Sequence, residues 1–101
     1  MSNDCTKNIT LAETLLILGD VKRSEVLYFL DKEDKFLGFD DISKGLKYDS
    51  ADEKIKMAFN LLALSDYFVE VKDNNFKINN VGKTACKILK SMDRITNKYN
   101  Q

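Results

Sequence analysis

The feature that most constrains this chain is a change in hydrophobic period near residue 80. Between residues 67 and 78, apolar and polar side chains alternate on both sides of Asp73-Asn74-Asn75, as in two antiparallel strands joined by a tight turn at Asn74-Asn75. After Asn80 the apolar residues recur at helical intervals of four and three. Two strands are marginal in water by themselves, so the hairpin must pack on helices. The sequence therefore predicts a mainly helical α+β fold in which a hairpin leads directly into a C-terminal helix.

Two capping boxes predict where two earlier helices begin. Thr10 is followed three residues later by Glu13, and Ser50 by Glu53. In each pair the hydroxyl and the carboxylate can satisfy backbone amides that have no partner within the helix. We therefore expect one helix to begin after Thr10 and a second, the strongest in the chain, to begin after Ser50.

The segment between these boxes contains further helix and strand signals. Asp20 follows Gly19 and can cap a helix with an apolar stripe between residues 26 and 30. Residues 36–39 could form a short strand, and Asp40 or Asp41 could cap a brief helix after it. This strand is a candidate third member of the sheet, which makes the sheet two- to three-stranded.

The helix after Ser50 carries two apolar rows, which predicts burial on two of its sides. We expect Lys54, Lys56 and Asn60 to lie on the remaining, outward face. The two rows consist of Ile55, Ala58, Phe59 and Leu62 on one side and Met57, Leu61 and Leu64 on the other.

The C-terminal helix, expected over residues 80–99, has an apolar row with the spacing of a two-helix coil. Docking on the protein's own core would explain the row as far as Leu89, but the last positions extend further than a small core reaches. We therefore predict a homodimer whose interface also includes Leu11 and Leu15 of the first helix. The positions of the row are Val81, Ala85, Ile88, Met92, Ile95 and Tyr99.

Length, charge and composition limit the classes of protein to consider. The 101 residues suit one domain, with residues 1–9 as a flexible N-terminus. Apolar runs are too short for a membrane span and no signal peptide is evident, which predicts a cytoplasmic protein without a membrane partner. The net charge is zero, but residues 1–41 carry a net charge of −4 (five basic, nine acidic) and residues 42–101 one of +4 (eleven basic, seven acidic). Such a split favours an anionic partner for the second half, or serves solubility.

Catalytic and metal-binding patterns are lacking in the sequence. The chain has no histidine, no glycine-rich phosphate loop and no nucleophile paired with a base. Cys5 and Cys86 are far apart and match neither a zinc site nor a disulfide framework. We therefore expect no enzyme activity, no cofactor and no metal, and a buried Cys86 thiol rather than a redox-active one.

Two segments resemble the ArsR-like winged helix-turn-helix regulators, which include many small archaeal proteins. The opening of those regulators is similar to LGDVKRSEVLYFL, residues 18–30, and their helix-turn-helix and wing are similar to FDDISKGLKYDSADEKIKMAFNLLALSDYFVEVKDNNFKINNVGKTACKIL, residues 39–89. The resemblance covers residues 15–92 and implies a homodimeric transcriptional regulator that binds double-stranded DNA, with the helix after Ser50 in the major groove and the 72–77 wing against the backbone or minor groove. The DNA-contacting residues it implies are Lys47, Ser50, Lys54, Lys56, Asn60, Lys72, Asn74, Asn75 and Lys77.

The chain also departs from these regulators in two places. The metal-sensing members carry a Cys-x-Cys pattern on the short helix, where this chain has FDDIS, so metal sensing of that type is not expected. Asp49, Asp52 and Glu53 crowd the start of the helix that would enter DNA. This acidic start leaves open an alternative function, a winged helix that binds a protein partner without contacting DNA.

Overall fold

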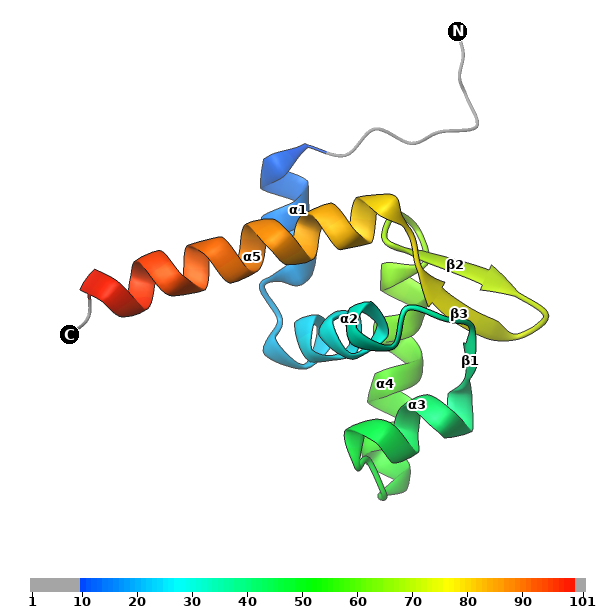
Figure 1. Ribbon diagram of the computed structural model, residues 1–101. Helices are drawn as coiled ribbons and strands as arrows, with labels where there is room; N and C mark the ends of the chain where they lie inside the picture. Colours follow the sequence, from blue (N-terminus) through cyan, green and yellow to red (C-terminus); the bar gives the residue numbers. More distant parts are fainter. Residues whose placement is uncertain (1–9, 100–101) are drawn as a thin grey trace, which may run out of the picture.

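The computed structural model describes the backbone of residues 10–99, together with the side chains of Thr10 and of residues 12–92. The described chain forms a mainly helical α+β fold with a three-stranded antiparallel sheet, which confirms the predicted class (Figure 1). Its elements are α1 (Leu11–Leu18), α2 (Val21–Glu33), β1 (Leu37–Gly38), α3 (Phe39–Leu46), α4 (Ala51–Leu64), β2 (Val69–Lys72), β3 (Asn75–Ile78) and α5 (Asn80–Tyr99).

Local capping sets the starts of the helices. The Thr10 hydroxyl accepts a hydrogen bond from the Glu13 amide at 3.0 Å, and the Ser50 hydroxyl accepts one from the Glu53 amide at 3.1 Å. Both predicted capping boxes are therefore confirmed. The prediction for α3 was wrong by a short distance, because this helix begins at Phe39 and its two aspartates lie inside the first turn, where the helix dipole favours carboxylates.

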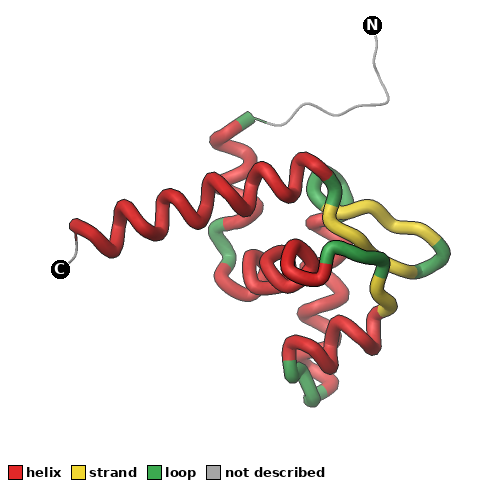
Figure 2. The backbone as a smooth tube through the Cα atoms, in the orientation of Figure 1, coloured by secondary structure: helices red, strands yellow, loops and turns green. Residues whose placement is uncertain are grey.

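The three strands are ordered β1-β3-β2, so the predicted third strand is present. In the hairpin Val69 lies opposite Ile78, and Lys72 lies opposite Asn75. This register leaves Asp73 and Asn74 as the two turn residues, with φ angles of 51° and 63°. The predicted turn at Asn74-Asn75 was wrong by one position, because aspartate also tolerates the left-handed conformation that a two-residue hairpin turn requires. Figure 2 shows the strands and this turn.

Helix α2 is central to the packing, since it contacts α1, α3, α4, α5 and β3. Its buried side chains Val26, Leu27 and Leu30 join one hydrophobic cluster with residues of every helix and of the sheet. From α4 this cluster receives only the row Met57, Leu61 and Leu64.

The prediction that α4 is buried on two sides was therefore wrong. The exposed fractions of Ile55, Phe59 and Leu62 are 56%, 67% and 68%, and Ala58 is also exposed. The physical reason is that α4 packs against α2 and α3 on one side, while the described chain places no element over the opposite side.

Helix α5 contacts the core through its first half. Ala85 and Cys86 are buried in the common cluster, whereas the helix continues well past α1 and α2 to its C-terminal end (Figure 1). Within residues 10–99 no helix is both long enough and apolar enough to span a membrane.

Candidate functional site

Two of the residues predicted to contact DNA, Lys54 and Lys56, lie on the outer face of α4. We use this name for the exposed residues of the helix, which form an apolar row with charged residues beside its N-terminal half. The row adjoins a groove of about 260 Å³ lined by Phe39, Ala58, Leu61, Leu62, Ser65, Val71 and Phe76. Because residues of α4 and of both hairpin strands line this groove, the outer face and the hairpin form one continuous surface. The residues of the outer face are Ala51, Asp52, Lys54, Ile55, Lys56, Ala58, Phe59 and Leu62.

Several charged and polar side chains at the start of α4 are engaged with one another. Lys56 Nζ lies 3.2 Å from Asp52 Oδ2, and this exposed i,i+4 pair offsets both charges while contributing little to stability. Hydrogen bonds from the Ser50 amide and hydroxyl, and a further one from the Asp49 amide, lower the pKa of the Glu53 carboxyl. Glu53 therefore stays ionised as a cap, and the Ser50 hydroxyl is engaged in the same cap. Lys54 is exposed on the outer face.

Asn60 does not lie on the outer face, so the prediction that it faces outward was wrong. It is only 8% exposed, and its Oδ1 accepts a hydrogen bond from Arg23 Nε at 3.3 Å. Arg23 Nη1 also donates to the carbonyl oxygen of Ile17 at 2.8 Å, so the arginine links α1, α2 and α4. This role of Arg23 could not be predicted from the sequence, because its two partners lie on other helices and no local pattern marks them.

A smaller cavity of about 130 Å³ lies between α2 and the start of α4, with Tyr48 and Lys22 among the residues that line it. The Tyr48 hydroxyl donates to Glu25 Oε1 at 3.0 Å, and Lys22 Nζ lies 5.2 Å from the centre of the tyrosine ring. Burial, followed by the hydrogen bond and the charge of Glu25, raises the pKa of Tyr48 to about 12.

The raised pKa of Tyr48 predicts a loss of stability at high pH. In the unfolded chain the phenol ionises near pH 10, whereas in the folded protein it does so near pH 12, so the contribution of Tyr48 is complete below pH 10 and is lost as the pH rises from 10 to 12. Between pH 9 and pH 11 the wild-type free energy of unfolding should fall by about 1 kcal/mol more than that of Tyr48→Phe. Urea denaturation at the two pH values measures this difference, and equal losses would contradict it.

The residues near the hairpin and the end of α3 that were predicted to contact DNA differ in how exposed their side chains are. Lys72 and Asn74 are exposed at the hairpin tip, and Lys47 is exposed where α3 ends. Asn75 and Lys77 are half-buried, and Lys77 Nζ lies 5.7 Å from the centre of the Phe36 ring. The structure thus leaves Lys47, Lys72 and Asn74 fully available for a partner.

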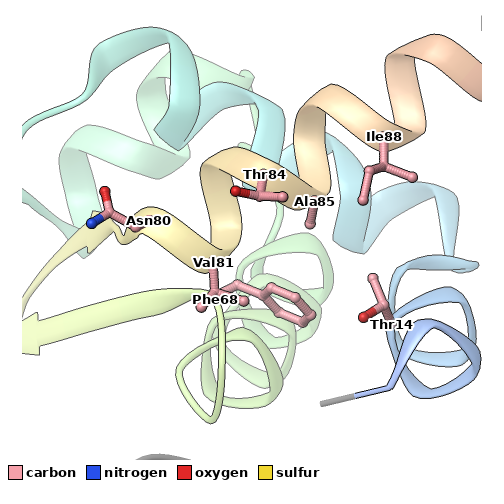
Figure 3. Close-up of a pocket in the computed structure, with 7 residues that line it drawn as sticks. All are labelled: Thr14, Phe68, Asn80, Val81, Thr84, Ala85 and Ile88. Carbon is pink, nitrogen blue, oxygen red and sulfur yellow. The ribbon is translucent and has the colours of Figure 1, made fainter. Parts of the chain in front are cut away.

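A second hollow surface lies between α1 and α5, where a cavity of about 410 Å³ has a largely apolar lining. Figure 3 shows Ile88 of α5 above Thr14 of α1, with Ala85, Thr84 and Val81 further along α5. Val81, Ile88 and Met92 are 45%, 38% and 42% exposed, and Leu15 is 37% exposed.

Not every residue of the predicted dimer interface is exposed enough to contact a second subunit. Ala85 is 4% exposed because it belongs to the protein's own core, so it offers little surface to a second subunit. The side chains of Leu11, Ile95 and Tyr99 lie outside the described residues, as do Cys5 and the whole 1–9 segment.

Two further residues near this surface have structural roles. Asn79 Nδ2 donates to the carbonyl oxygen of Tyr67 at 2.8 Å, and its Oδ1 accepts from the Gly82 amide at 2.8 Å, so Asn79 caps α5 and ties it to the hairpin. The sequence analysis did not identify this cap. Cys86 is buried as predicted, and burial, followed by the charge of Asp31, raises the pKa of its thiol to about 12, which keeps it unreactive at neutral pH.

Among residues 10–92 no three or more Cys, Asp or Glu side chains are grouped so that they could hold a metal ion. Comparison of the chain with protein-family models, curated proteins and solved structures found no match. The functional interpretation therefore depends on the geometry of the described surfaces.

Proposed function

We propose that this protein is a homodimeric DNA-binding regulator of the winged helix-turn-helix type. The observation that carries the proposal is the continuous surface formed by the outer face of α4 and the β2-β3 hairpin, joined by a shared groove. A helix of this kind fits the major groove of B-DNA, and an adjoining hairpin can reach the backbone or the minor groove. In this proposal α4 is the recognition helix and the hairpin is the wing.

Exposed lysines border this surface at three places. Lys47 lies at the end of α3, Lys54 on α4 and Lys72 on β2. Phosphate contacts position a protein on the duplex without reading its sequence, and lysine side chains supply them. We assign that role to these three residues, since Lys56 is paired with Asp52 and Lys77 lies against an aromatic ring.

The dimer of this proposal uses the surface between α1 and α5. A second copy packed on this surface would remove four partly exposed apolar side chains from water, which is favourable. They are Leu15, Val81, Ile88 and Met92. Two copies related by a two-fold axis would present two copies of α4 to successive major-groove segments.

The proposal predicts binding to duplex DNA that weakens steeply with salt. With three lysines on each subunit contacting phosphate, the plot of log affinity against log salt should have a slope of about −5. Lys54→Ala and Lys72→Ala should each make that slope shallower by about 2, because each removes two contacts from the dimer. Fluorescence anisotropy with a pool of random duplexes over a range of salt concentrations measures these slopes.

Lys87→Ala is the matched control for these variants. It removes the same charge from an exposed position, but on α5, which Figure 1 shows on the other side of α2 from α3. Its slope should equal that of the wild type. Duplex binding that is absent at low salt, or that does not depend on salt, would reject the DNA-binding proposal.

A protein partner is the second candidate function, and a specific observation favours it. Ile55, Phe59 and Leu62 leave a large apolar area of α4 open to water, and contiguous apolar patches of this kind are typical of protein-protein contacts. The same titration separates the two candidates, since a module that binds only proteins would show no duplex binding even at low salt.

A further inference from the structure

We propose that α4 recognises its DNA site through the methyl groups of thymine rather than through hydrogen bonds to base edges. The inference deepens the proposed function and rests on it. It assigns a substrate preference to two members of the apolar row on the outer face of α4, namely duplexes with thymines at the positions facing Ile55 and Phe59.

Hydrogen-bonding groups for base recognition are scarce on this face. Asn60 is the only amide side chain on α4, and it is buried against Arg23. The Ser50 hydroxyl is engaged in the capping box, and Lys56 is paired with Asp52. Lys54 remains, and we have assigned it to phosphate, so few polar groups of this face are left to distinguish the four base pairs.

Apolar groups, in contrast, are abundant on the same face. In the major groove the C5-methyl group of thymine is the distinctive apolar feature of a base pair, and apolar side chains recognise it by direct contact. Ile55 and Phe59 lie one helical turn apart with more than half of each side chain exposed, and the small Ala58 between them allows close approach. Burying a methyl group against these side chains is favourable wherever thymine is present and is lost wherever it is absent.

The position along the helix identifies the residues that read the methyl groups. The first half of a recognition helix contacts base edges in the helix-turn-helix mode of binding. Ile55 lies in the first half of α4 and Phe59 one helical turn further on, whereas Leu62, nearer the end of the helix, lines the groove shared with Val71 and Phe76 of the hairpin. Leu62 is as exposed as Phe59, and it therefore serves as the matched control on the same helix.

The test uses deoxyuridine, which differs from thymidine only by lacking the methyl group. Duplexes bound by the wild-type protein are first selected from a random pool, and each thymine of the selected site is then replaced singly by deoxyuridine. At contacted positions the affinity should fall about fourfold, the equivalent of one buried methyl group. The Ile55→Ala and Phe59→Ala variants should each bind thymine and deoxyuridine equally well at the position that the lost side chain contacts. The Leu62→Ala variant should still lose affinity about fourfold when deoxyuridine replaces thymine.

The outcomes separate this inference from the proposed function. Selected sites that tolerate deoxyuridine at every position would overturn thymine-methyl recognition while leaving DNA binding intact. An equal loss of discrimination in Leu62→Ala would overturn the assignment to Ile55 and Phe59. Failure to select any duplex would instead reject the proposed function. Binding to a protein that depends on Phe59 would in that case support the second candidate function, a module that binds a protein partner.

Discussion

Replacing Gly82 with alanine should lower the free energy of unfolding by about 2 kcal/mol or more, although alanine is the better helix former by about 1 kcal/mol. A Cβ atom at this position in α5 would press against the carbonyl oxygen of Phe68 and lie 2.6 Å from Ile78 Cγ1. The carbonyl cannot move away freely, because it accepts a hydrogen bond from the Asn79 amide at 3.0 Å. Chemical denaturation of the purified variant measures the loss.

Gly45→Ala is the control for this prediction. A Cβ atom on Gly45 would meet the ring of Phe29, which is the movable end of a side chain and only half-buried. The ring can turn aside, and the alanine gains helix propensity, so the loss should be much smaller than for Gly82→Ala. Equal losses in the two variants would show that the packing of α5 on the hairpin is not as tight as described.

The second large effect is expected on dimer formation, when charges are placed in the apolar row of α5. For the proposed dimer, we expect the double variant Ile88→Asp, Met92→Asp to raise the dimer dissociation constant by more than about 100-fold. Both side chains are already partly exposed, so the subunit itself should stay folded, whereas a carboxylate buried against a second copy would be costly. Sedimentation equilibrium measures the change, and circular dichroism verifies the fold.

Lys87→Asp is the control, since it places a carboxylate on the same helix but outside the apolar row. It should leave the dimer dissociation constant unchanged. The double variant should also bind a two-half-site duplex about 100-fold more weakly, because a monomer engages only one half-site. A double variant that remains dimeric would place the subunit interface elsewhere on the molecule.

Signals that act within a few residues were sufficient for much of the fold. The capping boxes at Thr10 and Ser50, the cap at Asp20 and the alternation of residues 67–78 each depend on neighbours along the chain, and the structure contains the corresponding helix starts and hairpin. The predicted start of α3 and the predicted turn residues of the hairpin each differ from the structure by one or two positions. In both places two adjacent residues are equally suited to the role, as a cap in one and as a turn residue in the other.

The candidate site was predictable only in part. Lys54 and Lys72 lie exposed, as a polar face and a hairpin tip suggested, but the composition of the α4 surface was different from the prediction. Asn60 turned inward because Arg23, which is 37 positions earlier in the chain, offers it a hydrogen bond. The apolar row of Ile55, Phe59 and Leu62 remained outside because the helices that α4 contacts cover only its other side.

The sequence by itself determined which segments are helices and strands, because capping, turn conformations and hydrophobic period are properties of short stretches of chain. The tertiary structure alone decided which of the two apolar rows of α4 is buried, because both rows are equally suitable for a core and the packing of α2 and α3 selects one of them. For the same reason the exposed row, and with it the kind of surface that α4 offers to a partner, became evident only once the helices were placed together.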